Sequence, residues 1–248
     1  MNEFAPIAEL MPDTFRILWR ENVSSTNDDL RALALKGTPE GLVLVCEEQA
    51  AGRGRRGAAW FSPKGESLAF SVLLRPIAPK SMWCRLSLAA GLAVAEALEK
   101  VIPLVEIKWP NDVLVSGRKI AGILVEAGAD FVIVGIGINV NSEHFPEGLG
   151  ATSLKVETGL EVSRAEVLLE VVKRLDRHAG RIDKDFPEIL ESVRERCALT
   201  GKSIALTYAE RRVEGFVRGI GSAGELLVEI SGKLETIFQA DEIRVIGD

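Results

Sequence analysis

The sequence predicts an α/β (α+β) protein with a mixed, mainly antiparallel sheet, helices packed on one face of it, and a small β-domain at the C-terminus. Short β-branched runs alternate with helix-period segments up to about residue 199, and residues 81–101 are almost all apolar, as in a buried central helix. From residue 200 to residue 248 only short strand patterns recur, separated by turn residues. We therefore expect two domains, residues 1–199 and residues 200–248.

Each element of the large domain has a local signal. Ser24, Ser25 and Thr26 are N-cap candidates for a first short helix, and Ser163 with Glu166 forms a capping pattern before a later one. In chain order we expect a strand at 14–20, a helix from about 26 to 37, strands at 42–47 and 67–74, the apolar helix at 81–101, a strand at 105–109, a hairpin of strands 113–115 and 119–125, a strand at 131–139, and helices at 164–181 and 186–196.

The C-terminal segment predicts five short strands and no helix. They are expected at residues 203–208, 212–220, 226–230, 235–238 and 242–245. Strand spacing alone indicates only a small β-domain of about fifty residues.

Composition excludes several classes of protein. The 248 residues are 47% hydrophobic with mean hydropathy +0.15, so a folded core is expected. The net charge of −6 argues against non-specific nucleic-acid binding, which needs a basic surface. No signal peptide opens the chain and no apolar stretch reaches membrane-spanning length, so we expect a cytoplasmic protein without a membrane partner.

Cysteine and histidine give no sign of a metal site or a disulfide framework. Cys46, Cys84 and Cys197 are scattered and are expected to be buried or half-buried free thiols. His144 and His178 lie far apart without a ligand partner at metal spacing, and both are expected at the surface. We therefore assign no metal-binding residues.

The arginine loop, residues 49–57 (Gln-Ala-Ala-Gly-Arg-Gly-Arg-Arg-Gly), combines flexibility with positive charge. Its three glycines permit close approach of the backbone to a ligand, and its three arginines offer forked donors for carboxylate or phosphate. The pattern is neither a dinucleotide-binding motif, because the third glycine opens no apolar helix, nor a P-loop, because no Gly-Lys-Ser/Thr follows. By itself it leaves open a solvated basic loop or a nucleic-acid tether.

A second motif follows about fifty residues later. Lys108–Asp112 places a cation, an aromatic ring, a proline, an amide and a carboxylate in succession. A site that activates a carboxylic acid with a nucleotide needs such groups, because cations must cancel the repulsion between carboxylate and phosphate.

Together the two motifs resemble the biotin–protein ligase (biotin–[acetyl-CoA-carboxylase] ligase) family. The resemblance runs from about residue 17 to the C-terminus and includes three further segments: Ser25-Thr26-Asn27, residues 117–124 and residues 135–141. It implies that the chain activates biotin with ATP as biotinyl-5'-AMP and transfers it to a lysine of a biotin carboxyl carrier domain. It also implies an SH3-like barrel at the C-terminus, Mg²⁺ entering with ATP, and a homodimer.

The resemblance also assigns roles to residues that match the family motifs. The implied catalytic residues are Lys119, Arg55 and Asp112. The implied biotin contacts are Ser25, Thr26, Asn27, Gln49, Arg53, Gly54, Arg55, Lys119 and Gly122. The implied nucleotide contacts are Arg55, Trp60, Asn111 and Asn139.

Two alternatives stay open from the sequence. A lipoate–protein ligase shares the fold and the two-step chemistry, although the Trp109–Asp112 run favours biotin. A non-catalytic nucleic-acid-binding module would use the arginine loop, but the acidic composition argues against it. Some members of the resembled family carry an N-terminal winged-helix DNA-binding domain; only about twenty residues precede Ser24, so we expect the monofunctional type and no DNA partner.

Overall fold

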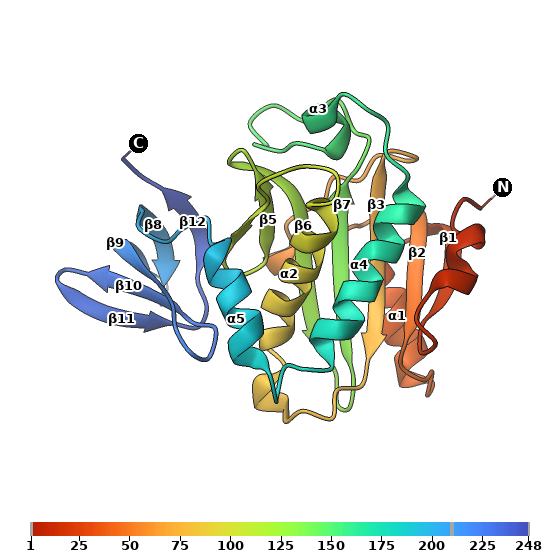
Figure 1. Cartoon of the computed structure of the whole chain (residues 1–248), viewed down its shortest axis with the longest axis horizontal. Coiled ribbons are helices and arrows are strands. Elements are labelled where there is room, and N and C mark those ends of the chain that lie inside the picture. The colour runs from red at the N-terminus through yellow and green to blue at the C-terminus, as the bar shows by residue number, and fades with distance from the viewer. Residues whose placement is uncertain (1, 209–210, 248) are drawn as a thin grey trace.

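The computed structural model describes residues 2–208 and 211–247, and it contains two sheets that lie next to each other (Figure 1). The larger sheet has seven strands in the order β1-β2-β3-β7-β6-β5-β4. Strands β1 (Arg16–Val23) and β2 (Leu42–Gln49) pair in parallel, and every other neighbouring pair in this sheet is antiparallel. The predicted mixed, mainly antiparallel sheet is confirmed.

The centre of this sheet is buried on both faces. β3 (Ser67–Leu74) pairs with β7 (Val132–Asn139) along its whole length, and every residue of both strands is buried. The remaining strands are β4 (Glu106–Lys108), β5 (Asp112–Val115) and β6 (Arg118–Ala127). Such continuous apolar strands need cover on both sides.

Helices supply that cover, and one of them corrects the prediction. α2 (Arg85–Leu98), α4 (Arg164–Ala179) and α5 (Phe186–Glu195) lie in front of the sheet in Figure 1. α1 (Thr26–Leu35) packs on the opposite face, where it forms a separate core with Leu44 and Cys46 of β2. The alternate β2 residues Val43 and Val45 point into the core beneath α2 and α4. The helices therefore do not all lie on one face.

Several short helices were not predicted from the sequence. The structure adds α3 (Leu154–Thr158) and three short 3₁₀ helices, η1 (Ala5–Leu10), η2 (Arg55–Gly57) and η3 (Lys80–Met82). α2 is shorter than the predicted 81–101 at both ends. Local patterns place ends less reliably than elements.

The C-terminal sheet, β8–β12, is antiparallel in the order β11-β10-β9-β8-β12, which confirms the predicted C-terminal strands. Its strands are β8 (Ser203–Tyr208), β9 (Arg211–Ile220), β10 (Leu226–Ile230), β11 (Lys233–Ile237) and β12 (Asp241–Val245). Its apolar residues join the core of the large sheet, and Trp109 Nε1 donates to the Gly224 carbonyl at 2.9 Å. Independent folding of residues 1–199 and 200–248 stays a prediction.

Two side-chain predictions were wrong. His178 is buried, because it lies one helical turn beyond Leu175 and two turns beyond Val171 on the inner face of α4. Its Nε2 lies 3.0 Å from Glu96 Oε2. Cys84 is exposed, whereas Cys46 is buried, and burial raises the pKa of the Cys46 thiol to about 12. Over residues 2–208 and 211–247, no helix is long and apolar enough to cross a membrane.

Candidate functional site

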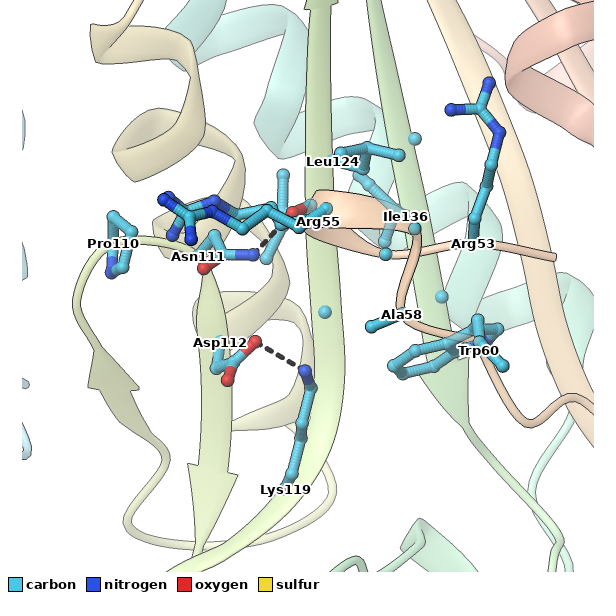
Figure 2. Close-up of a pocket in the computed structure, with 18 of the residues that line it drawn as sticks. Arg53, Arg55, Ala58, Trp60, Pro110, Asn111, Asp112, Lys119, Leu124 and Ile136 are labelled. Carbon is cyan, nitrogen blue, oxygen red and sulfur yellow. Dashed lines mark hydrogen bonds and ion pairs between the residues drawn. The ribbon is translucent and has the colours of Figure 1, made fainter. Parts of the chain in front are cut away.

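One large cavity collects most of the predicted site residues. Its volume is about 700 Å³, and it lies between the N-terminus of α1, the arginine loop, strands β5–β7 and the start of β12 (Figure 2). The predicted residues that line it are Ser25, Thr26, Asn27, Gln49, Arg53, Gly54, Arg55, Trp60, Asn111, Asp112, Lys119 and Gly122. Predicted residues from four separate parts of the sequence therefore line a single space.

Glycines on two neighbouring strands make its floor. A Cβ at Gly135 of β7 would overlap the Asn27 amide, and a Cβ at Gly137 would overlap the Trp60 indole. On β6 a Cβ at Gly122 would come within 3.0 Å of the Trp60 ring. These glycines allow Asn27 and Trp60 to lie directly on the sheet.

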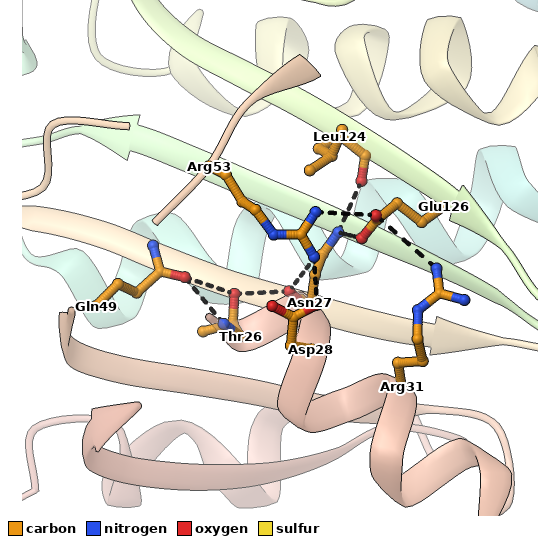
Figure 3. A network of polar contacts seen from close by, with 9 residues as sticks. Thr26, Asn27, Asp28, Arg31, Gln49, Arg53, Leu124 and Glu126 are labelled. Atoms are coloured by element: carbon orange, nitrogen blue, oxygen red, sulfur yellow. Dashed lines mark hydrogen bonds and ion pairs between the residues drawn. The ribbon is translucent and has the colours of Figure 1, made fainter. Parts of the chain in front are cut away.

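The polar pocket, formed by Thr26, Asn27 and Gln49, lines one end of the cavity (Figure 3). The buried Ser71 does not line the cavity but contacts Thr26 and Asn27 from the strand below. Gln49 Oε1 accepts from Thr26 N at 2.9 Å and from Thr26 Oγ1 at 3.1 Å. Ser71 Oγ lies 2.7 Å from Thr26 Oγ1 and 2.6 Å from Asn27 Oδ1. These neutral groups are fixed by one another, which suits a neutral ligand with both donors and acceptors. Ser71 was not predicted from the sequence; its only signal was a hydroxyl in the middle of a mainly apolar strand.

A charged network lies beside this pocket and ties it to the arginine loop (Figure 3). Glu126 of β6 accepts from Asn27 Nδ2 at 2.7 Å and from Arg53 Nη1 at 3.3 Å. Arg53 Nη2 also donates to Asp28 of α1, and this hydrogen bond is the main cause that raises the pKa of Arg53. Neither Asp28 nor Glu126 was among the site residues predicted from the sequence.

The charged mouth, formed by Lys108, Asp112, Lys119, Arg55 and Asp241, occupies the other end. Lys119 Nζ lies 2.6 Å from Asp112 Oδ1 and 5.5 Å from the centre of the Trp60 ring (Figure 2). Burial lowers the pKa of Lys108, and the nearby Asp112 opposes that shift. The Lys119 ammonium lies close enough to Lys108 that its charge also lowers the pKa of Lys108.

The segment between β4 and β5 is braced against β6. Asn111 Nδ2 donates to the Ile123 carbonyl at 2.9 Å, and the Trp109–Pro110 peptide bond is cis. This hydrogen bond helps to fix Asp112 opposite Gly122, where it meets Lys119.

The far side of the charged mouth comes from the C-terminal sheet. Arg55 Nη2 donates to the Ala240 carbonyl at 3.3 Å and lies 3.4 Å from Asp241 Oδ1, and Arg56 pairs with the other carboxylate oxygen of Asp241. No pattern in the sequence singled out Asp241.

Asn139 lies outside the cavity. Its amide is buried and donates to the Thr152 carbonyl at 3.0 Å and to the Lys119 carbonyl at 3.4 Å. In this conformation Asn139 supports the strand that carries Lys119, and its side chain does not face the cavity. The nucleotide contact that the resemblance implies for Asn139 stays a prediction.

Within the described parts of the chain, no group of three or more histidine, cysteine, aspartate or glutamate side chains is arranged to hold a metal ion. Asp112 and Asp241 already have cationic partners. The donors around the charged mouth fit Mg²⁺ only as an ion that arrives on phosphates and keeps its waters.

Comparison with known proteins identifies close relatives. The model of the biotin/lipoate A/B protein ligase family matches residues 19–141. The biotin–[acetyl-CoA-carboxylase] ligase of Mycobacterium tuberculosis is 32% identical over 243 residues, covering 92% of this chain and 90% of that protein. The bifunctional ligase/repressor BirA of Bacillus spizizenii is 34% identical over 237 residues, covering 91% and 73%. The solved structure of the biotin protein ligase from Aquifex aeolicus with biotin and ATP superposes with a TM-score of 0.83 at 34% identity, covering 94% of this chain and 99% of that one.

Proposed function

We propose that this chain, which belongs to the biotin–protein ligases of the biotin/lipoate A/B protein ligase family, joins biotin to a lysine of an acceptor protein at the expense of ATP. The proposal rests on one observation: the neutral polar pocket and the charged mouth lie inside the same cavity. Biotin itself has these two parts, a neutral ureido ring and a carboxylate. The relative from Aquifex aeolicus holds biotin and ATP in the same fold.

In this proposal the polar pocket binds the ring. The ureido group presents two N–H donors and one carbonyl acceptor, and the Gln49, Thr26 and Asn27 side chains offer complementary atoms. Because Ser71 and Glu126 already fix these side chains, little conformational entropy is lost when the ring enters.

The first chemical step takes place at the charged mouth. A carboxylate oxygen of biotin forms a bond to the α-phosphorus of ATP, the bond between that phosphorus and the bridging oxygen breaks, and pyrophosphate leaves. Lys119 and Arg55 offset the repulsion between the two anions and stabilise the charge that develops on phosphorus. When bound to the ATP phosphates, Mg²⁺ would supply further neutralisation of the charge on the pyrophosphate.

The second step transfers the acyl group. An acceptor amine attacks the acyl carbon of biotinyl-5'-AMP, AMP leaves, and the amine loses a proton. Asp112 is the carboxylate that we assign to accept that proton, since it lines the cavity and lies 2.6 Å from Lys119. Trp60 offers a flat apolar face for the adenine, and its buried Nε1 has no hydrogen-bond partner among the described residues.

The acceptor and the assembly are proposals from the family. A biotin carboxyl carrier domain is the expected acceptor, a homodimer is the expected assembly, and the cytoplasm is the expected compartment.

Biotin-dependent exchange of labelled pyrophosphate into ATP tests the proposed function. Purified protein should catalyse the exchange with biotin and not with lipoate, and labelled biotin should then appear on a carrier domain. Exchange that depends on lipoate alone would assign the chain to the lipoate branch of the family instead.

A further inference from the structure

We propose that Asp241 is a positioning residue for the nucleotide: it holds Arg55 and Arg56 of the arginine loop over the charged mouth before ATP binds. This inference rests on the proposed function, because it assumes that the arginines meet a phosphate. It gives the C-terminal sheet a defined part in a site whose other groups come from the large sheet.

The contacts connect two distant parts of the chain. The Asp241 carboxylate bridges two guanidinium groups, with Oδ1 lying 3.4 Å from Arg55 Nη2 and Oδ2 paired with Arg56. The adjacent Ala240 carbonyl accepts a hydrogen bond from Arg55 Nη2 at 3.3 Å, in addition to this ion pair. Three oxygen atoms at the start of β12 therefore fix the tip of the arginine loop.

An irregularity in β12 delivers this carboxylate. Residues 240–243 all line the cavity, whereas a regular strand would turn alternate side chains away. The register between β12 and β8 shifts between Asp241 and Arg244, and Glu242 has a positive φ of 51°. The Asp241 side chain is only 12% exposed, and a carboxylate removed from water to this extent requires charged or hydrogen-bonding partners.

The arginine loop needs such an anchor. Gly52, Gly54 and Gly57 leave it many conformations, so ordering it around a phosphate costs conformational entropy. In the empty protein Asp241 restricts those conformations in advance. ATP then meets guanidinium groups that are already in place, which strengthens its binding.

Arg55 keeps donors available while it is held. Among the described residues its hydrogen bond uses only Nη2, so Nε and Nη1 can still donate to phosphate oxygens. Arg53 differs, because its Nη1 and Nη2 are both engaged by Glu126 and Asp28. Arg53 is therefore bound to carboxylates beside the polar pocket. Arg55 is held at the charged mouth and keeps two nitrogen donors for a phosphate.

Asp241→Asn in the full-length protein tests this assignment. We expect the KM for ATP in biotin-dependent pyrophosphate exchange to rise about tenfold, the factor carried by one charge-assisted hydrogen bond. The Kd for biotin should stay within about twofold of the wild-type value, because the polar pocket is untouched. Trypsin should also cleave the ligand-free variant faster after Arg55 and Arg56. Glu229→Gln is the matched control, since it removes a carboxylate paired with Arg218 elsewhere on the C-terminal sheet.

A second protein variant distinguishes a positioning role of Asp241 from a general loss of stability. In an Arg55→Gln/Arg56→Gln protein, Asp241→Asn should change the KM for ATP no further, because Asp241 acts through these arginines. An unchanged KM and unchanged trypsin cleavage in the single variant would overturn the proposal, and so would an equal weakening of biotin binding. If the wild-type protein shows no biotin-dependent exchange, the proposed function fails, while trypsin cleavage still tests the Asp241 contact.

Discussion

The two ends of the cavity are built by different physical means. In the polar pocket, neutral side chains of α1, β2 and β3 hydrogen-bond to one another beneath a network of fixed charges. In the charged mouth, ion pairs join different strands and even different sheets, as between Lys119 and Asp112 or between Arg55 and Asp241. A rigid neutral surface can bind the part of the ligand that stays unchanged in the reaction. The reacting part needs charged groups that can change their ion-pair partners as the reaction proceeds.

Lys119→Ala should give the largest effect, because it removes a cation from the charged mouth. We expect biotin-dependent pyrophosphate exchange to fall by about 100-fold or more, the usual effect of losing one preorganised charged donor. The fold should survive, since the Lys119 side chain is 34% exposed. Lys155→Ala is the matched control, because Lys155 pairs with the exposed Glu143 instead. An exchange rate near that of the control would remove Lys119 from the proposed mechanism.

Two alanine substitutions on β7 should affect the two ends of the cavity independently. Gly135→Ala would displace the Asn27 amide, and Gly137→Ala would displace the Trp60 indole. We expect the first to raise the Kd for biotin and the second to raise the KM for ATP, each by about 10- to 100-fold, as roughly 1–3 kcal/mol of overpacking would do. Calorimetry for biotin and exchange kinetics for ATP give the two values. If both variants affect both ligands equally, the cavity does not have two separable ends.

Arg55→Gly should release the activated intermediate. Biotinyl-5'-AMP reacts with any exposed lysine, and a guanidinium on its phosphate retains it. The off-rate of the adenylate should rise about tenfold, the factor for one lost charge-assisted hydrogen bond, while its synthesis continues at a reduced rate because Lys119 remains. Bystander albumin mixed with the variant, biotin and ATP should become biotinylated on a streptavidin blot. A clean blot together with an unchanged off-rate would show that Arg55 does not retain the intermediate.

Lys108→Met should give the smallest change and should stabilise the protein while lowering its activity. Burial lowers the pKa of Lys108, so below that pKa folding must desolvate an ammonium group. Removing the charge should raise Tm by about 2 °C at neutral pH. As pH rises through the lowered pKa, folded Lys108 loses its proton and the stability of the wild-type protein rises relative to the unfolded chain. The difference between the two proteins, measured by thermal unfolding, should therefore narrow at alkaline pH; a difference that widens would contradict this explanation.

Much of the fold follows from local sequence. The predicted strands 67–74, 203–208 and 226–230 occur at the same residues in the structure, because short apolar runs bounded by turn residues depend on neighbours in the chain. The Ser163 cap is likewise local, since its hydroxyl accepts from Glu166 N at 3.2 Å. The motifs that line the cavity were also evident in sequence, because each occupies one short segment.

The partners of those motifs were decided by the tertiary structure. Asn27 meets Glu126 across 99 positions of sequence, and Arg55 meets Ala240 across 185. The sequence also did not indicate which face of the sheet α1 covers, or that the Asn139 amide is buried away from the cavity. Periodicity and caps report how a segment relates to its own neighbours, whereas these contacts depend on strand register and on how two sheets pack. The sequence by itself therefore determined which chemical groups this protein carries, and only the tertiary structure decided which of them face one another.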